Sequence, residues 1–486
     1  MIYKLRPYQE ECVKSISDYI NSDRHDPVLI VGPVGCGKSL LIAEAARLMG
    51  DKTLILQPSK ELLQQNHNKI TSYGIPATIY SASCGKKELS NMIYATLGSI
   101  KKVVGQLKEM GIRNVLIDEA HAGYSPEDGS EFMTFMNELK PKKVIGFTAT
   151  PCRLKTMSIG QVSYSRLNFI TRMRPVYFKN LIHVIQVEEM IRQGFWTPLK
   201  YETWDFNGDA LKLNSNGSEY TAESISEAVR KNGLNNLILR RLMVLKDVCR
   251  SILVFMDSVE SCNTAAEWMN AKICAGMAEA VHGGTPKKQR EAIVEGFKSG
   301  KTKVVFNYSA LGTGFDHPGL DCVIVGRPTF SFSSFYQWLG RAVRIKDGKD
   351  SALVVDCCNN SSRFGNIRKL SIENYKGYGW GMFIGDKLIT NIPMGDKVTK
   401  TDLDIKAAKK DRRRGLAQGV TAAPVPGRPD HPLGSTVMTF GKYCGWMFHS
   451  IPVSYFKFIN ETFDWDNDRN KDIKEYIDFL IKNNRL

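Results

Sequence analysis

The segment from Gly32 to Ser39 constrains the fold of this 486-residue chain more than any other feature. It follows the apolar run 28–31 and precedes a helical pattern that begins near Leu40. Backbone N–H groups of a glycine-rich loop at a helix N-terminus converge on phosphate oxygens, and the helix dipole favours anions there. The sequence therefore predicts a strand–loop–helix unit that binds nucleotide phosphates. Its expected contact residues are Gly32, Pro33, Val34, Gly35, Cys36, Gly37, Lys38 and Ser39.

Within this loop, two side chains have separate expected roles. Lys38 is placed to reach the β and γ phosphates, and the Ser39 hydroxyl is placed to ligate Mg²⁺. The spacing GxxxxGK[ST] occurs by chance in some chains, but the flanking strand and helix patterns make it specific.

Short apolar runs recur along the chain, each bounded by turn or helix-start residues. A first series covers 28–31, 53–56, 114–117 and 143–146, and a second covers 252–255, 302–306, 322–325 and 352–355. Continuous runs of this length predict strands that are buried on both faces. Helical patterns such as 40–49 and 287–298 lie between them, and this alternation predicts parallel sheets. Two such series predict two α/β domains in tandem.

Composition narrows the class of protein. Hydrophobic residues make up 43% and charged residues 24% of the chain, as in soluble globular proteins. No run approaches the ~18 apolar residues that a bilayer span needs, and the N-terminus lacks a signal-peptide core. The 11 cysteines have no metal-type spacing and argue against a disulfide framework. We therefore expect a reduced, cytoplasmic protein.

The charge balance favours a polyanionic partner. The formal net charge is +16 and the isoelectric point is about 9.2, which favours nucleic acid ahead of a membrane surface. Residues 151–180 interleave basic and aromatic side chains without an acid, a pattern that suits phosphate contacts and base stacking. The alternative is an exposed hairpin with a solvated basic face. The expected contacts in this stretch are Arg153, Arg166, Phe169, Arg172 and Arg174.

Acidic residues follow the predicted strand 114–117. Asp118 and Glu119 come directly after it, in the run Asp118-Glu-Ala-His121. An acid at the end of a central strand beside a phosphate loop can hold the metal, and its neighbour can polarise the attacking water. We expect Asp118 to be the metal residue and Glu119 the general base.

Two arginines near the end of the second series complete the predicted chemistry. Arg341 and Arg344 lie about one helical turn apart and so share one face of their segment. Guanidinium groups that reach across a domain cleft would neutralise the charge that develops on the transferred γ-phosphoryl group. The alternative is a pair of surface residues in ordinary ion pairs.

Together, Gly32–Ser39, Asp118–His121, Phe147–Pro151 and Gln337–Arg344 resemble the motif set of superfamily 2 helicases of the DEAH-box type. The motifs occur in the order of that family and the resemblance covers roughly residues 1–360. It implies two tandem RecA-like parallel-sheet domains, with ATP and Mg²⁺ as cofactors. The catalytic set implied by the resemblance is Lys38, Asp118, Glu119, Gln337, Arg341 and Arg344.

Further roles rest on the same resemblance. The N-terminal segment Leu5–Gln9 is similar to the adenine-reading motif, and Gly312–Asp316 is similar to motif V. The implied nucleotide contacts are Arg6, Gln9 and Asp316. The implied coupling residues, between nucleotide state and nucleic-acid grip, are His121, Thr148 and Thr150. The implied nucleic-acid contacts are Ser59, Thr96 and Thr313.

The expected domain organisation has five parts. They are a first RecA-like domain at 1–200, a linker at 201–235, a second RecA-like domain at 236–399, a flexible linker at 400–435 and a small α+β module at 436–486. The segment 188–196 resembles the domain linker of DNA-directed members of the superfamily. The module resembles a small domain often appended to DNA-processing proteins and could bind DNA junctions or dock a protein.

The leading functional hypothesis is an ATP-dependent DNA helicase or translocase. It would unwind or branch-migrate forked and four-way junction DNA, as tailed-phage branch-migration helicases do, in phage replication, recombination or repair. The sequence lacks a PD…ExK nuclease pattern, which argues against a complete restriction subunit. We expect a monomer, in the host cytoplasm if the chain is phage-encoded. The alternatives are an RNA-dependent ATPase and a nucleotide-gated binding clamp.

Overall fold

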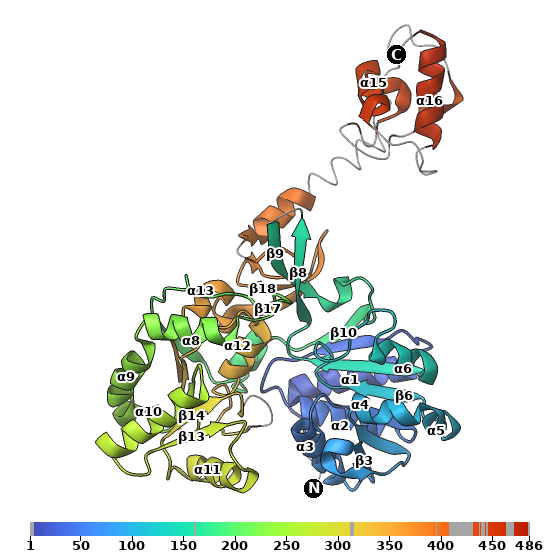
Figure 1. The fold of residues 1–486 in the computed structure, drawn as a ribbon. Coiled ribbons are helices and arrows are strands. Elements are labelled where there is room, and N and C mark those ends of the chain that lie inside the picture. The colour runs from blue at the N-terminus through green and yellow to red at the C-terminus, as the bar shows by residue number, and fades with distance from the viewer. Residues whose placement is uncertain are drawn as a thin grey trace. The chain divides into compact units, whose positions relative to one another are not determined.

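The computed structural model describes residues 4–159, 162–311, 315–394, 396–407, 431–436, 438, 443, 446–462 and 471–484 (Figure 1). These residues divide into two compact units, one formed by 1–374 and 380–398 and the other by 375–379 and 399–486.

The first sheet of the larger unit has eight strands in the order β10-β1-β7-β6-β2-β5-β3-β4, and every neighbouring pair except β3 with β4 is parallel. Its strands are β1 (Val28–Val31), β2 (Thr53–Leu56), β3 (Thr78–Ser81), β4 (Lys86–Lys87), β5 (Met92–Ala95), β6 (Asn114–Ile117), β7 (Lys143–Thr148) and β10 (Asn180–Val184). The residues of β1, β2, β6 and β7 are all buried, because helices cover both faces of the sheet (Figure 1). The helices of this domain are α1 (Pro7–Asn21), α2 (Lys38–Met49), α3 (Lys60–Thr71), α4 (Leu97–Ile100), α5 (Val104–Glu109) and α6 (Glu131–Leu139).

The second sheet has six parallel strands in the order β11-β16-β15-β12-β14-β13. Its strands are β11 (Leu199–Thr203), β12 (Ile252–Phe255), β13 (Ala278–His282), β14 (Val304–Tyr308), β15 (Cys322–Val325) and β16 (Ala352–Asp356). The accompanying helices are α7 (Val187–Arg192), α8 (Ala222–Lys231), α9 (Leu234–Val248), α10 (Val259–Lys272), α11 (Lys287–Ser299), α12 (Phe332–Leu339) and α13 (Asn360–Phe364). Two parallel sheets flanked by helices confirm the predicted pair of RecA-like α/β domains.

The interval 201–235, expected to be a linker, is instead part of the second domain. Strand β11 pairs with β16 along its whole length, and α8 buries Ile225 and Val229 in the second core. Residues 205–223 are rich in Asn, Ser and Gly. Within them, the Glu219 carboxylate accepts hydrogen bonds from the Thr329 hydroxyl and, at 2.7 Å, from the Phe330 N–H. The composition of the interval resembles that of a linker because its polar loop outweighs the apolar residues of α8, which follows the loop.

A two-stranded antiparallel hairpin follows the first sheet. It consists of β8 (Cys152–Ile159) and β9 (Val162–Phe169), which pair through eight residues each. Its second strand contacts a later part of the chain, because the Asn391 side chain accepts a hydrogen bond from the Phe169 N–H at 3.1 Å. A small sheet in the order β17-β18-β19-β20 follows the second domain. Its strands are β17 (Leu370–Tyr375), β18 (Gly379–Ile384), β19 (Lys387–Leu388) and β20 (Val398–Thr399).

The smaller unit has its own apolar core. Met438, Phe448, Phe456, Tyr476 and Leu480 are among its fully buried side chains. The regular elements that the structure describes beyond residue 430 are the short 3₁₀ turns Pro432–Ser435 and Phe448–Ser450 and the helices α15 (Val453–Thr462) and α16 (Lys471–Lys482). Of the expected flexible linker, residues 408–430 lie outside the described residues, whereas 400–407 are helical.

Among the residues that the structure describes, no helix is both long enough and apolar enough to cross a membrane. The cysteines among these residues are free thiols.

Candidate active site between the two RecA-like domains

The phosphate-binding loop lies between β1 and α2. Its first residue, Gly32, donates its N–H to the Thr148 carbonyl at 3.0 Å, which aligns the loop with the end of β7. Gly37 has a φ of +84°, and a Cβ there would lie 2.6 Å from Nε2 of Gln9. A side chain at this position would therefore combine backbone strain with a steric clash. Helix α2 begins at the next residue, so its free N–H groups face the loop.

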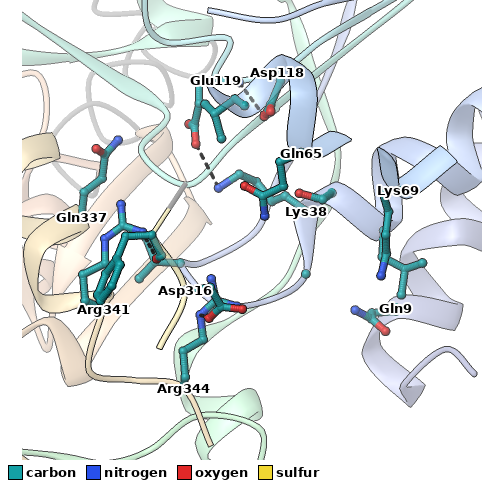
Figure 2. Close-up of a pocket in the computed structure, with 18 of the residues that line it drawn as sticks. Gln9, Lys38, Gln65, Lys69, Asp118, Glu119, Asp316, Gln337, Arg341 and Arg344 are labelled. Carbon is teal, nitrogen blue, oxygen red and sulfur yellow. Dashed lines mark hydrogen bonds and ion pairs between the residues drawn. The ribbon is translucent and has the colours of Figure 1, made fainter. Parts of the chain in front are cut away.

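A cavity of about 450 Å³ opens beside this loop and is lined by both domains (Figure 2). The predicted residues that line it are Arg6, Gln9, Val34, Gly35, Gly37, Lys38, Ser39, Asp118, Glu119, Asp316, Gln337, Arg341 and Arg344. The cavity has the size of a typical small-molecule site. Figure 2 shows Gln337 and Arg341 facing Lys38 from the second domain.

Lys38 and Glu119 form a buried ion pair in the cavity. The Lys38 Nζ lies 3.2 Å from the Glu119 Oε1, and both side chains are more than four-fifths buried. Burial opposes ionisation of Glu119, but the positive charge of Lys38 holds its pKa below the usual value. Burial also disfavours the charge on Lys38, yet the Glu119 carboxylate raises its pKa. The pair is therefore charged at neutral pH.

The backbone at Glu119 is strained. Its φ is +45°, in a region that residues other than glycine rarely adopt. Such strain concentrates at functional sites because the surrounding structure must enforce it. Glu119 lies two residues after Ile117, the last residue of β6, and its backbone conformation brings the carboxylate over the phosphate-binding loop (Figure 2).

Asp118 lies deeper, and both of its carboxylate oxygens are engaged. One accepts a hydrogen bond from Nδ2 of Asn66 and the other from the Glu119 N–H, each at 2.9 Å. Burial, followed by the negative charge of Glu119, raises the pKa of Asp118 to about 7. Asn66, on α3, was not predicted from the sequence.

The arrangement fits a magnesium ion that is shared with phosphates. The described residues contain no cluster of three or more His, Cys, Asp or Glu side chains that could hold a metal without other ligands. Mg²⁺ usually combines one or two protein oxygens with phosphate oxygens and waters. Asp118 and Ser39 line the same cavity and would supply those protein oxygens.

The two arginines of the second domain lie in the turn after α12. Arg341 donates to the Phe315 carbonyl at 2.7 Å, and burial, followed by the charge of Arg344, lowers its pKa to about 10. It therefore remains charged at neutral pH. Arg344 pairs with the predicted nucleotide contact Asp316 at 3.5 Å.

A segment between the domains connects the phosphate-binding loop to the arginine turn. The indole of Trp196 donates to the Val34 carbonyl at 2.8 Å. The next residue, Thr197, donates its N–H to the Val343 carbonyl and its hydroxyl to the Arg344 carbonyl, both at 2.8 Å. Two consecutive residues therefore bond to both walls of the cavity.

Lys349 stabilises the same turn from outside every recognised motif. Its Nζ donates to the carbonyls of Ala342 and Arg344, each at 2.7 Å, and to that of Pro318 at 3.1 Å. Ala342 directly follows Arg341, Arg344 is the second arginine, and Pro318 lies two residues after Asp316. The lysine thus fixes the backbone that carries the arginines.

Replacing Lys349 by methionine should slow ATP turnover while leaving the cavity lined as before. The change keeps the length of the side chain but removes all three hydrogen bonds. We expect a fall in turnover of about tenfold or more, since small misplacements of reacting groups cost up to ~100-fold. Steady-state turnover at saturating ATP measures the effect. Lys346→Met, in an exposed part of the same loop, is the matched control, and equal turnover of the two variants would refute the assigned role.

The predicted coupling residues come together. Nδ1 of His121 lies 2.8 Å from the Thr148 hydroxyl, and the same hydroxyl accepts the Thr150 N–H at 3.0 Å. Both threonines are fully buried.

Of two predicted nucleic-acid contacts, Phe169 lies in the core and the half-buried Arg153 bonds to the protein backbone. Phe169 has none of its surface exposed and belongs to the main core, so the expectation that it stacks on a base is wrong. Arg153 donates through its guanidinium to the carbonyls of Ala120 and Tyr124, and so supports the loop around His121 from behind. Its observed contacts are to the protein backbone.

The other predicted contacts have mixed positions. Arg172 and Arg174 are exposed, and Arg166 is half-buried. Ser59 caps α3 by accepting the Leu62 N–H at 3.3 Å, and the half-buried Thr96 bonds to neighbouring serines. Thr313 lies outside the described residues. These nucleic-acid roles remain predictions.

Some cavity residues were not predicted. Gln65 and Lys69 extend from α3 and Phe315 from the second domain. Gln65 and Lys69 are four residues apart and therefore share a helix face, which is a detectable signal. Nothing in the sequence shows that this face is directed at a nucleotide.

Two domain families match the chain. Residues 2–153 match the family described as the res subunit of type III restriction enzymes, and residues 235–346 match the helicase conserved C-terminal domain. The first match falls on the first RecA-like domain and the second on the second domain, so the chain is similar to proteins that carry a pair of helicase domains. Because the first match names the type III restriction family, the DEAH-box subtype remains a prediction.

Several proteins of known name are similar in sequence. A 51.5 kDa protein of a Lactococcus phage is 25% identical over 68% of this chain and 65% of its own length. The ATP-dependent DNA helicase Hel308 of Pyrococcus horikoshii is 25% identical over 69% of this chain and 49% of its own. The DNA 3'-5' translocase XPB2 of Sulfurisphaera tokodaii is 24% identical over 72% of this chain and 81% of its own. Two fungal relatives named as ATP-dependent helicases are longer, and this chain spans 38% and 58% of their lengths. The chain therefore spans less than two thirds of these two relatives and of the phage protein.

The fold also has solved counterparts. The ATP-dependent type ISP restriction-modification enzyme LlaBIII, solved bound to DNA, aligns with a TM-score of 0.55 and 15% identity. The alignment covers 86% of this chain and 30% of that one. At this identity the likeness shows a shared fold.

Proposed function

We propose that this chain, which carries the two domains of a superfamily 2 helicase, is an ATP-dependent DNA helicase or translocase that unwinds or branch-migrates forked and junction DNA. One observation supports the proposal most: a single cavity combines Lys38 and Glu119 from one domain with Arg341 and Arg344 from the other. Phosphoryl transfer needs a phosphate cradle, a residue that activates water and a charge-neutralising arginine. All of these groups are present in the cavity.

The ion pair between Lys38 and Glu119 indicates how ATP would start the reaction. Incoming phosphates compete with Glu119 for the Lys38 ammonium group, because they carry more negative charge. The released carboxylate can then accept a proton from the attacking water. Mg²⁺, held by Ser39 and Asp118, would neutralise charge on the β and γ phosphate oxygens.

The second domain would contribute charge at the transition state. Arg341 is half-buried and charged, and its guanidinium lies across the cavity from Lys38 (Figure 2). Because the two walls belong to different domains, bound ATP would draw them together and hydrolysis would release them. Repeated closure, with each domain holding the strand, would move the protein along DNA.

DNA is the proposed substrate for two reasons. Relatives of this chain include a DNA helicase and a DNA translocase. The net charge of +16 also favours a polyanion. We further propose that the protein acts as a monomer in the cytoplasm, that of the host if the chain is phage-encoded, with the module at 436–486 available for DNA or a protein partner.

ATP turnover with different nucleic acids tests the proposal. Turnover would be measured at fixed salt without nucleic acid and with single-stranded DNA, duplex DNA, a four-way junction and RNA. We expect the strongest stimulation with single-stranded or junction DNA. Stimulation by RNA alone would indicate an RNA-directed helicase, and the absence of ATP turnover under all conditions would indicate a binding clamp.

A junction assay tests the narrower part of the proposal. A four-way junction with one labelled arm would be incubated with the protein, ATP and Mg²⁺. Conversion to forked products supports branch migration. Intact junctions and forks in the presence of active ATPase would exclude branch migration while leaving the translocase in place.

A further inference from the structure

A serine of the second domain contacts the predicted coupling residues of the first. Ser333 lies in the first turn of α12, two residues after the cap residue Ser331. Its hydroxyl lies 3.1 Å from Nε2 of His121 and 3.2 Å from the Thr150 hydroxyl. The contact therefore spans the two domains that form the ATP cavity.

The same imidazole contacts the proposed general base. Nδ1 of His121 lies 3.4 Å from Oε2 of Glu119 and 2.8 Å from the Thr148 hydroxyl. One ring thus connects the carboxylate at the cavity with the second domain through its opposite nitrogen. Ser333 stands at the far end of this connection.

His121 and Ser333 can form their hydrogen bond in either tautomer of the imidazole ring. Burial lowers the pKa of His121, so the ring is neutral at pH 7 and carries its proton on one nitrogen only. A hydroxyl can donate or accept, so Ser333 can pair with either tautomer of the ring. The bond to Ser333 therefore depends on where the second domain lies relative to His121, which closure of the ATP cavity would change.

We propose that the Ser333 hydroxyl is a positioning residue that couples the state of the ATP site to the grip on DNA, through His121 and Thr150. The inference rests on the proposed function, because it assigns a residue to the link between hydrolysis and DNA affinity. Ser333 lies outside the motif segments recognised in the sequence and has no chemical role of its own in hydrolysis. Its contribution is the bond that joins the two domains beside the catalytic carboxylate.

The adjacent serine offers a matched control. The Ser334 hydroxyl donates to the Ser331 hydroxyl at 3.1 Å, within the same turn of the second domain. Ser334→Ala therefore removes a hydroxyl from the same helix without touching His121 or Thr150. Ser333→Thr retains a hydroxyl at the contact position and serves as the conservative variant.

The test compares DNA affinity in two nucleotide states. Binding of a labelled single-stranded oligonucleotide would be measured with and without a non-hydrolysable ATP analogue, and the ratio of the two affinities reports coupling. In Ser333→Ala we expect this ratio to move toward one by about fivefold, the lower end of typical coupling effects. We expect Ser334→Ala to match wild type and Ser333→Thr to retain most of the ratio.

Further measurements separate coupling from folding and from ATP binding. Thermal melting and affinity for the analogue in the absence of DNA should be close to wild type in all three variants, because Ser333 does not line the cavity. A merely structural role would change these values and leave the affinity ratio intact.

The outcomes distinguish the inference from the proposed function. If the DNA affinity of the wild-type protein does not depend on nucleotide, the proposed function fails and the inference fails with it. If the wild-type protein responds and Ser333→Ala responds equally, the inference alone is overturned. The same holds if Ser334→Ala loses as much coupling as Ser333→Ala.

Discussion

Replacing Glu119 by glutamine is expected to lower ATP turnover by about 10³-fold, within the range that general bases contribute. The amide has nearly the same shape but cannot accept a proton from the attacking water at neutral pH. ATP affinity should be unchanged or higher, because the change removes a negative charge 3.2 Å from Nζ of Lys38, the proposed phosphate contact. Turnover at saturating ATP and equilibrium binding of a fluorescent ATP analogue measure the two effects separately.

Glu109→Gln provides the control for this experiment. Glu109 is exposed at the end of α5, so its replacement changes the net charge equally without altering the cavity. If Glu119→Gln kept turnover within tenfold of this control, another group would have to activate the water. A loss of analogue binding would instead indicate that the ion pair with Lys38 maintains the phosphate-binding loop.

Replacing Arg341 by alanine is expected to have a comparable effect, a loss of about 10³-fold in turnover, as for other arginine fingers. The side chain is half-buried, and one of its observed bonds holds the Phe315 carbonyl at 2.7 Å. Its charge would act mainly on the γ-phosphoryl group as negative charge develops there. Turnover should therefore fall far more than affinity for an ATP analogue, and both would be measured in the presence of DNA.

Two further variants sharpen the interpretation of the Arg341 experiment. Arg341→Lys retains a charge but loses the planar fork, so it should restore little of the activity. Arg368→Ala removes an exposed arginine from the same domain and should leave turnover unaltered. Equal loss of affinity and turnover in Arg341→Ala would assign the arginine to ground-state binding.

Sequence predicted most of the strands that are buried on both faces, although β5 (Met92–Ala95), whose four residues are all buried, was missed. Val28–Val31 and Asn114–Ile117 are almost wholly apolar, which a strand covered by helices requires. By contrast β13, with the sequence Ala-Glu-Ala-Val-His, alternates with polar residues, and β11 is mostly polar. Edge strands with partly exposed residues of this kind do not stand out from loops, so both were missed.

The error at Phe169 has a different origin. An aromatic ring in a basic stretch gives the same composition whether it faces solvent or the core. The structure places Ser165, Leu167 and Phe169 on one buried side of β9, opposite Arg166. The period of two along a strand therefore carried the missing information, which composition ignored.

The candidate site was predicted wherever a charged side chain follows a strand or occupies a recognised motif. Asp118 and Glu119 are examples of the first kind, and the cavity contains both. Lys349 and Thr197 could not be predicted, because they bind backbone carbonyls whose positions depend on tertiary packing. Ser333 could not be predicted because its hydrogen-bond partners belong to the other domain.

Trp196 and Thr197 hydrogen-bond to both walls of the cavity, and these bonds leave very little unrestrained chain between the two domains. Only Pro198 separates Thr197 from the first residue of β11, and its ring restricts the backbone there. The Pro198 carbonyl also accepts the Ala352 N–H at 3.0 Å, which secures the start of that strand. While these bonds hold, the domains can turn about this point but cannot drift apart. A small rotation about this point would therefore produce the largest displacement at the sheet edges farthest from it, whereas the two walls of the cavity would stay close together.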